Sequence, residues 1–448
     1  MSDLLNIGAT GIKAYQGALS TVSENIANAG TAGYSRRTTS LSEITPAGSA
    51  QMQHVLTAGG GVRISAVNRA ADMFKAADVR SASTDLARSE TGITWLTGIQ
   101  TALTGNQLGD RLTSFFNATA AIAADPTAST PRATMIEAAK SVASAFTATG
   151  QALDQVSATL DATAQTAVTG LDNLGASLAR VNEGLSRTAP NSSAAADLAD
   201  QRDSILEQMS AITDVSVSTD DAGRATVRVG GANGPVLVAG NQAGSVTYAH
   251  DANGNVSFAV HRIGVNAAFT SSGGALAGIV DGGTRIVDAR NQLNAIASSF
   301  TTGVNAAQAQ GQDLDGNTGA SFFAVGVSPT DIAVTLNDPN GIAAASVGGG
   351  TRDNSNLKAF AAVRNTGQSE SKTTALIGDN AAALSARQQV ADVQSSIRDN
   401  AVAARDSVSG VNLDTEAVDL MRFQQAYSAS SRVIQVARET LQSILDIR

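Results

Sequence analysis

The stretch DTEAVDLMRFQQAYSASSRVIQVARETLQSILDI, from Asp414 to Ile447, contains no proline and no glycine, so it predicts one long helix. Apolar residues recur in it every seven positions, in two rows three places apart, which is the pattern of a coiled coil. The first row contains Leu413, Leu420, Tyr427, Ile434 and Leu441, and the second contains Phe423, Ser430, Ala437 and Ile444. Such a helix would be roughly 50 Å long and therefore needs a long partner.

The first residues of the chain offer this partner, because they carry the same spacing. Its two rows contain Leu5, Ile12, Leu19 and Ile26, and Gly8, Tyr15 and Val22. We call all these rows together the seam and predict that the two ends of the chain pair along it. Gly8 and Ser430 weaken the seam, so we expect the helices to become ordered when neighbouring subunits add apolar surface. The alternative is two ordinary amphipathic helices in one globular core.

Composition excludes several functions for this chain of 448 residues. Its net charge is -9 and its pI about 4.9, which argues against nucleic acid as a partner. There is no cysteine, so disulfides, thiol catalysis and cysteine metal sites are excluded. The first residues do not form an ordinary secretory signal, and no apolar run is long enough to cross a bilayer. Taken alone, these observations predict a soluble cytoplasmic protein without membrane insertion.

Local patterns predict a mainly helical chain that carries a small antiparallel β domain as an insert. The first helix should end near Asn28, followed by an extended segment over 38–61 and a strand over 62–67. Alternating valines then indicate hairpins, after which helical signal resumes at Gly283. The predicted domains are a terminal coiled-coil assembly domain with an extended linker (1–69 and 400–448), a helical middle domain (70–211 and 264–399) and an outer β domain (212–263). Within the middle domain, 131–150 and 151–185 are predicted as separate helical segments.

No motif for catalysis, metal binding or cofactor binding is found. His54, His250 and His261 do not have zinc-ligand spacing. The acidic sequences 313–317 and 251–255 favour turns over calcium loops, because the first lacks the glutamate expected at the twelfth position and the second suits a hairpin turn. We therefore predict no enzyme, no metal and no cofactor.

Six blocks of sequence resemble the flagellar hook-associated protein 1 family. They are NIANAGTAGYSRR (25–37), GGGV leading to Arg69 and Asp72 (59–72), ADQRD (199–203), GGALAG (273–278), SGVNLDTEAV (409–418) and RFQQAY (422–427). The matching motif residues of the first block include Asn28, Gly33, Tyr34, Ser35 and Arg36. Ala32 stands where the family usually has proline, which puts the turn in question. Arg36 and Arg37 are expected either to contact an acidic surface of a neighbouring subunit or to be solvated.

The resemblance implies a nested axial-protein architecture and a structural junction protein between hook and filament. It implies export by the flagellar type III apparatus without a cleaved signal peptide, which corrects the cytoplasmic expectation to an extracellular one at the hook-filament junction. The implied partners are further copies of the chain, the hook protein below, the next junction protein and the filament above, and an export chaperone at the C-terminal helix. The alternatives are a rod or hook axial protein, an enzyme carried in the β domain, and a surface adhesin acting through that domain.

Overall fold

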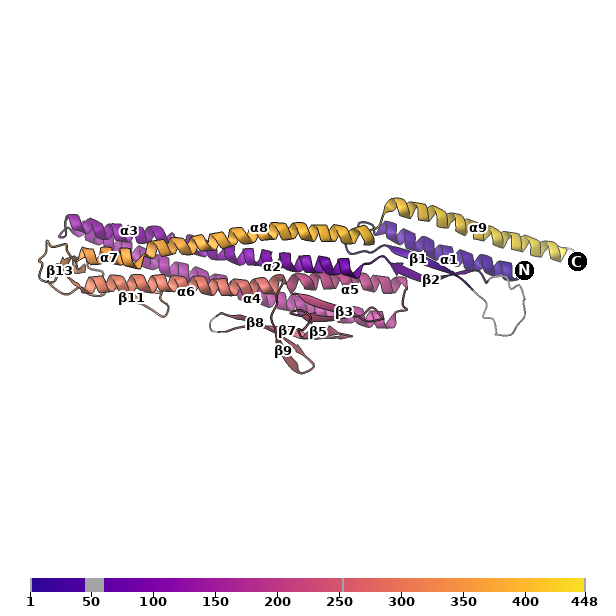
Figure 1. Ribbon diagram of the computed structural model, residues 1–448, viewed down its shortest axis with the longest axis horizontal. Helices are drawn as coiled ribbons and strands as arrows, with labels where there is room; N and C mark the ends of the chain where they lie inside the picture. Colours follow the sequence, from indigo (N-terminus) through magenta and orange to yellow (C-terminus); the bar gives the residue numbers. More distant parts are fainter. Residues whose placement is uncertain (1, 45–59, 252–253, 447–448) are drawn as a thin grey trace.

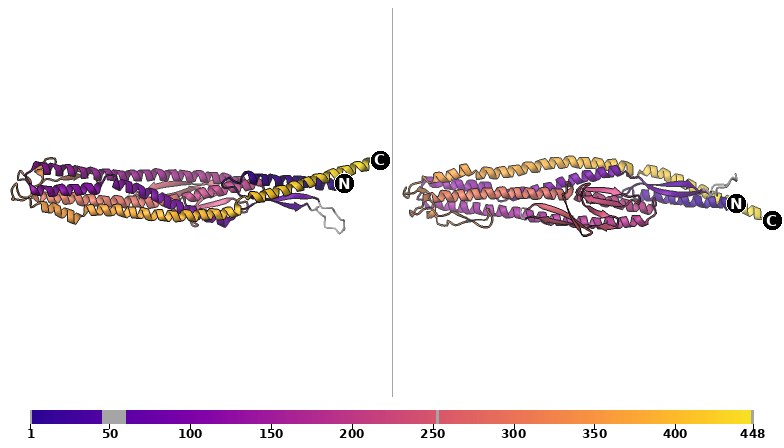
Figure 2. Two further views of the ribbon diagram at one scale, coloured as in Figure 1. Left: turned by 90° about the horizontal axis from the view of Figure 1, so that it is seen from above. Right: turned by 60° about the horizontal axis from the view of Figure 1, so that its bottom comes forward.

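The computed structural model describes residues 2–44, 60–251 and 254–446. Within these ranges the chain is elongated, with its two ends side by side at one extreme and loops at the other (Figure 1, Figure 2). A terminal part is followed by a helical body, and a β-rich insert lies along one side of the body. Most of the segment predicted as extended, together with His54 and Gly59, lies outside the described residues.

The terminal part confirms that the two ends of the chain pair. It consists of α1 (Ser2–Ala27), α9 (Leu413–Asp446) and a hairpin of β1 (Arg37–Glu43) and β2 (Val62–Arg69). The helices α1 and α9 are antiparallel, because Gly8 lies against Ile434 while Asn25 contacts Glu416. The hairpin packs on α1 as well. The first helix ends one residue before the predicted Asn28.

The helical body consists of long helices that run along the molecule. They are α2 (Met73–Thr104), α3 (Leu108–Ala121), the 3-10 turn η1 (Ile122–Ala124), α4 (Ser129–Arg187), α5 (Ser193–Ile212), α6 (Gly274–Ala309), α7 (Leu357–Gly367) and α8 (Ser369–Ser409). The helices α2 and α6 lie in the middle, with α4 packed on one side of them and α8 on the other (Figure 2). Phe115 and Phe300, whose ring centroids are 5.3 Å apart, are fully buried in the distal half of this core.

The β-rich insert between α5 and α6 forms two antiparallel sheets. Its strands are β3 (Val215–Thr219), β4 (Ala225–Val229), β5 (Val236–Ala239), β6 (Gln242–Ala243), β7 (Ser245–His250), β8 (Val256–Arg262) and β9 (Val265–Phe269). The first four are adjacent in chain order and the last three form the second sheet. The insert extends to Phe269, past the predicted limit at 263, because Ile263 and Gly264 are the turn of the last hairpin, both with positive φ.

Glycines explain two further differences from the predicted helices. The segments 131–150 and 151–185 are one continuous helix, α4, in which a Cβ on Gly150 would lie 2.6 Å from Arg290 and from Thr330. The helix α6 begins at Gly274 rather than at Gly283, and a Cβ on Gly282 would lie 2.3 Å from the ring of Trp95. These glycines therefore allow close packing against neighbouring elements and do not end helices.

The distal loops between α6 and α7 are held together by a buried arginine. They contain the paired strands β10 (Gly311–Gln312) and β13 (Ala345–Ser346), the paired strands β11 (Phe323–Val325) and β12 (Ile332–Val334), and the 3-10 turn η2 (Pro339–Gly341). Arg132, in the first turn of α4, is 1% exposed. It donates to the carbonyl oxygens of Pro126, Pro339 and Ile342 at 2.6, 3.1 and 2.8 Å.

None of the helices in the described ranges is long and apolar enough to cross a membrane. Across the same ranges, no three histidine or acidic side chains are grouped in a way that could hold a metal ion. Asp313 accepts hydrogen bonds from the backbone N–H groups of Asp315 and Asn317, as expected of a loop that closes on itself.

Candidate functional site: the junction between the terminal helices and the body

A tight turn follows α1 and directs the chain to the junction. The N–H of Tyr34 donates to the carbonyl of Thr31, and Gly33 has a φ of +80°. This is the pattern of a type II turn, which needs positive φ at its third residue and accepts alanine as well as proline at its second. Ala32 occupies that second position, so the turn forms without the proline usual in the family.

The side chain of Asn25, at the end of α1, connects this turn to α9. Asn25 is fully buried; its Nδ2 donates to Oε2 of Glu416 at 2.9 Å and to the carbonyl of Arg37 at 2.8 Å. Its Oδ1 accepts from the hydroxyl of Tyr34 at 2.9 Å and from the N–H of Arg37 at 3.0 Å. Arg36 reaches the same carboxylate, with Nε 2.6 Å from Oε1 of Glu416. One buried amide and one buried carboxylate thus join α1, α9 and the turn.

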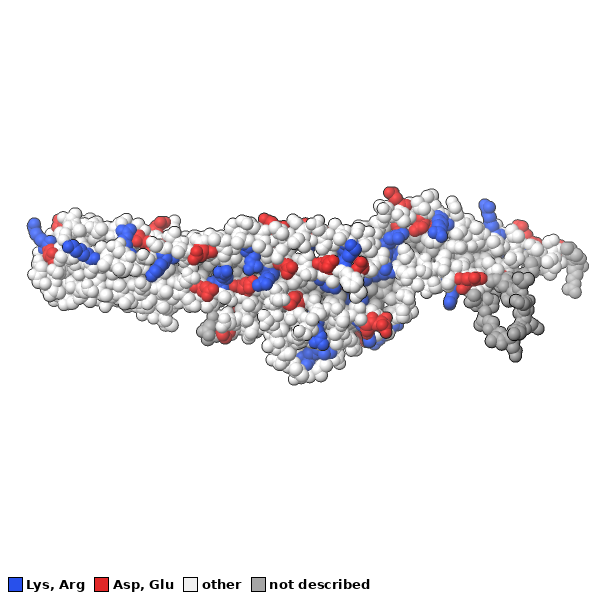
Figure 3. Space-filling view, in the orientation of Figure 1, with Lys and Arg blue, Asp and Glu red and all other residues white. Residues whose placement is uncertain are grey.

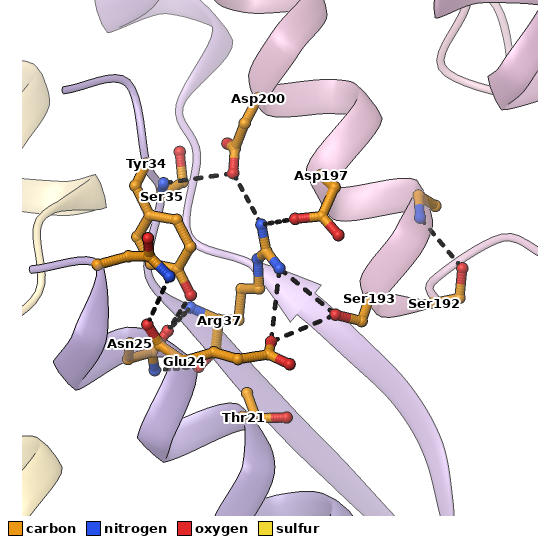
Figure 4. A network of polar contacts seen from close by, with 12 residues as sticks. Thr21, Glu24, Asn25, Tyr34, Ser35, Arg37, Ser192, Ser193, Asp197 and Asp200 are labelled. Carbon is orange, nitrogen blue, oxygen red and sulfur yellow. Dashed lines mark hydrogen bonds and ion pairs between the residues drawn. The ribbon is translucent and has the colours of Figure 1, made fainter. Parts of the chain in front are cut away.

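The side chain of Arg37 points in the opposite direction, toward α5 (Figure 4). Its guanidinium is 3.1 Å from Asp200 and 2.6 Å from Asp197, and its carbon Cζ lies 4.8 Å from the centre of the Tyr34 ring. Arg69, at the end of β2, binds the other oxygen of Asp200 at 2.6 Å. Asp200 therefore bridges both strands of the hairpin to the body.

We call these residues the junction network; they are Asn25, Tyr34, Arg36, Arg37, Arg69, Asp197, Asp200 and Glu416. Burial alone would lower the pKa of Arg37, but hydrogen bonds to Asp197 and Asp200 outweigh it and raise its pKa, so the cation is retained. The expectation that Arg36 and Arg37 are solvated or contact a neighbour is wrong for this structure. Acidic residues of the same chain neutralise both arginines, because the fold brings α5 and α9 next to the turn.

Replacement of Arg37 by methionine should loosen the terminal part from the body. The change leaves the 11% exposed carboxylate of Asp200 with fewer partners, and breaking a largely buried pair of this kind costs about 3 kcal/mol before allowance for the more exposed Asp197. Limited proteolysis should then cut within 28–36 faster than in the wild type. Arg63→Met, on an exposed arginine of the same hairpin, is the control and should leave the cleavage rate unchanged. Equal cleavage of the two variants would contradict the role given to Arg37.

Tyr34 should make the junction sensitive to alkaline pH. Burial raises the pKa of Tyr34 from its ordinary value of 10.0 to about 12, an effect opposed by the charge of Arg37 and reinforced by Glu24, Asp200 and Asp197. Because the folded pKa is above the unfolded one, the contribution of the neutral hydroxyl is complete below pH 10 and is lost as the pH rises toward 12.

The measurement is the thermal unfolding of the wild type and of Tyr34→Phe from pH 8 to 12. At pH 8 the variant should be less stable by about 1 kcal/mol, the value of one hydrogen bond. The difference should shrink or reverse above pH 10, whereas a constant difference would refute the titration of Tyr34.

The structure brings together only part of the predicted seam. Val22 is buried, and a second group is half-buried between α1, α9 and the hairpin, namely Leu5, Ile12, Tyr15, Leu19, Leu420, Phe423 and Ile434. The rings of Tyr15 and Phe423 are 6.5 Å apart. Among the small seam residues, Gly8 and Ala437 are buried and Ser430 is half-buried. The remaining large seam residues are exposed in this chain, namely Ile26, Leu413, Tyr427, Leu441 and Ile444.

The most buried row of α1 consists of small residues. The seven-residue spacing of large side chains does not identify this row. Its members are Gly8, Gly11, Ala14, Ala18 and Thr21. A Cβ on Gly8 would lie 2.6 Å from Cγ1 of Ile434, and one on Gly11 would lie 2.7 Å from Oγ of Ser430. The two helices therefore approach closely along this row, and the large seam residues flank the contact.

Of the five motif residues, four take part in the junction directly. Ser35 is buried with its N–H 3.5 Å from Asp200, Tyr34 and Arg36 make the contacts given above, and Gly33 supplies the turn. Asn28 is at the end of α1 and donates to the carbonyl of Glu24. The partners Asn25, Asp200 and Glu416 were not predicted as site residues, although each lies in one of the blocks 25–37, 199–203 and 409–418. The available sequence signal for these three residues was their place in separate family-like blocks, which come together in the fold.

The fold and the junction define a class of elongated structural proteins whose two ends pair and are fixed to a helical body. Comparison with known proteins identifies the family. The model described as "Flagellar hook-associated protein FlgK helical domain" matches residues 96–323, slightly more than half of the chain. The chain therefore belongs to the family of flagellar hook-associated protein 1, which consists of structural proteins of the flagellum and not of enzymes.

The relatives share this name. "Flagellar hook-associated protein 1" of Salmonella typhimurium is 30% identical over 349 residues, which cover 73% of this chain and 60% of that protein. The protein of the same name in Bacillus subtilis is 25% identical over 97% of this chain and 96% of its own length. The chain thus spans about 60% of the length of the Salmonella relative.

Two further matches concern parts of the chain. The model described as "Flagellar basal body rod FlgEFG protein C-terminal" matches residues 405–447, which include α9. A solved structure of the flagellar hook junction protein FlgK from Burkholderia pseudomallei is similar with a TM-score of 0.49 and 24% identity, over 55% of this chain and 46% of that one.

Proposed function

We propose that this chain joins the hook to the filament of a bacterial flagellum, as a structural junction protein. The observation that carries the proposal is the convergence of three sequence blocks at the junction network, which fixes the antiparallel pair of terminal helices to the helical body. In a subunit built in this way, the position of the terminal helices fixes the position of the helical body. Membership of the hook-associated family supports the junction between hook and filament over a place in the rod or hook.

The contacts between subunits involve the outer side of α9 in this proposal. Val418, Met421 and Val436 are 60, 55 and 60% exposed, although they are apolar and lie on a helix that is otherwise paired. Neighbouring copies cover them on assembly, which couples the stability of the terminal part to polymerisation. The hook protein lies below this layer, and the next junction protein and the filament lie above it.

Export completes the proposed function. The chain leaves the cell through the flagellar type III apparatus without cleavage of a signal peptide, and a chaperone holds the C-terminal helix beforehand. The same exposed face of α9 suits a chaperone, because it would otherwise promote early association in the cytoplasm. The final location is extracellular, at the hook-filament junction.

The test is deletion of the gene in the source organism, with electron microscopy of the cells and an assay of flagellin in the medium. We expect bare hooks and unpolymerised flagellin outside the cell, both reversed when the gene is restored. Missing hooks would make the chain a rod or hook component, and normal filaments would refute a structural role in the flagellum.

A further inference from the structure

The outer face of α8 carries an apolar stripe that no element of the described chain covers. Val390, Val393 and Ile397 are 46, 61 and 53% exposed, at the three- and four-residue spacing of one helical face. Val408, farther along the helix, is 43% exposed. Exposed aliphatic side chains in a row on a well-packed helix indicate a contact with another molecule.

At Val390 the stripe continues into a groove with an excess of positive charge. The groove has a volume of about 430 Å³ and lies between α2, α6 and α8. Its lining includes Gly92 and Gly282, together with three arginines and one aspartate. Arg88 and Arg387 both contact Asp281, at 3.0 and 3.4 Å. Charged side chains of both signs are visible over this middle region of the body (Figure 3).

Arg285 is the third arginine of the groove, and within the described residues it has no ion pair or side-chain hydrogen bond. It is exposed, so it is available to a carboxylate of a second molecule. The groove therefore favours a partner that is acidic where it meets Arg285 and uncharged along the valine stripe.

The opposite side of the body offers a surface of this kind. Between Lys140 and Arg180 the helix α4 contains no basic residue, and its only charged residues are Asp154, Asp161 and Asp172. Asp161 and Asp172 are bound by β7, through the hydroxyl of Tyr248 at 2.5 Å and the N–H of Val246 at 2.7 Å. The carboxylate of Asp154 is 62% exposed, although it is 3.3 Å from Arg290, so it is the acid of this face that can meet Arg285 of a second molecule. The exposed positions between these acids are alanine, threonine and glutamine.

We infer that the α8 face of one subunit packs against the α4 face of the next. Because α4 and α8 lie on opposite sides of α2 and α6, each copy offers both surfaces, and a heterologous contact of this type repeats around a ring or a helix. The partner of the stripe and groove is thus a second copy of this chain. The inference rests on the proposed function and specifies the lateral surfaces of the body, which are separate from the terminal helices.

The absence of cysteine allows a direct test by cross-linking. Two double variants are expressed in the deletion strain, Val393→Cys with Ala162→Cys and Ile397→Cys with Thr169→Cys. Hooks are then isolated with the protein attached. A long, flexible bismaleimide should link either pair into a ladder of oligomers. Each single variant should give no ladder, and neither should Val393→Cys combined with Val265→Cys on β9, where Val265 is 63% exposed.

The charge complementarity is tested in the same variants. Arg285→Glu should remove most of the ladder, whereas Arg285→Lys should retain it. Subunits present on hook ends without a ladder from either pair, or dimers from Val393→Cys alone, would overturn the inference and leave the proposed function intact. Absence of the wild-type chain from hook ends would refute the proposed function and with it the inference.

Discussion

Replacement of Arg132 by methionine should lower the free energy of unfolding of the helical body by about 2 to 3 kcal/mol. The guanidinium is almost completely buried and donates to three carbonyl oxygens from two separate segments, the connection before α4 and the loop at η2. Methionine fills a similar volume but leaves the carbonyl of Pro126 without this donor, at about 1 to 3 kcal/mol where water does not reach it. The carbonyls of Pro339 and Ile342 still accept from the N–H groups of Ile342 and Ala344, at 3.4 and 3.0 Å.

One effect opposes this loss. Burial lowers the pKa of Arg132, against the attraction of Asp313, so the native state bears a cost for holding the cation. Methionine removes that cost, which partly offsets the loss of the hydrogen bonds made by the guanidinium. The measurement is urea unfolding followed by circular dichroism. Arg180→Met, on an exposed arginine of the same helix, is the matched control and should be close to neutral. An Arg132 variant as stable as this control would show that the carbonyls find other donors.

Replacement of Gly8 by valine should separate α1 from α9 and abolish the assembly of the chain. A Cβ at this position would lie 2.6 Å from Cγ1 of Ile434 and 3.3 Å from the carbonyl oxygen of Ser430, so a side chain cannot enter without moving a helix. Overpacking of this kind costs about 1 to 3 kcal/mol, while the gain in helix propensity over glycine is below 1 kcal/mol. Because the close approach of α1 to α9 depends on Gly8 and Gly11, we expect a side chain at Gly8 to prevent the native pairing.

The matched control is Ala9→Val, on the adjacent exposed position of the same helix. Both variants are expressed in the deletion strain, and the amount of each in the medium is measured to show that export is intact. The Gly8 variant should be exported yet leave hooks bare and flagellin unpolymerised, while the Ala9 variant should restore filaments. Filaments with both variants would show that close approach of the two helices is not needed for assembly.

The sequence predicted those features that depend on neighbours along the chain. The seven-residue spacing in α1 and α9 indicated two long helices that pair, and Gly33 indicated the turn at which α1 ends. Alternating valines indicated the hairpins of the β-rich insert. Such patterns can be read directly because helix and strand periods place residues on one face regardless of the remaining fold.

Two glycines within helices show where prediction from local sequence patterns was wrong. Gly150 is the predicted boundary between two helical segments, and Gly282 directly precedes the predicted restart of helix at Gly283, while glycine lowers helix propensity by about 1 kcal/mol. In the structure both are within helices, at points where Thr330 and Trp95 approach. Local propensity is overridden because a closely packed neighbour stabilises the helix by more than the glycine destabilises it.

By itself, therefore, the sequence determined the helical class, the pairing of the two ends, the insert of strands and, through its blocks of motif residues, the flagellar family. Only the tertiary structure decided which residues form the junction. Arg37 and Asp200 are separated by 163 residues, and Asn25 and Glu416 by 391. Neither pair has a signal in local periodicity, because an ion pair or hydrogen bond between distant segments exists only when packed helices bring both partners within about 3 Å.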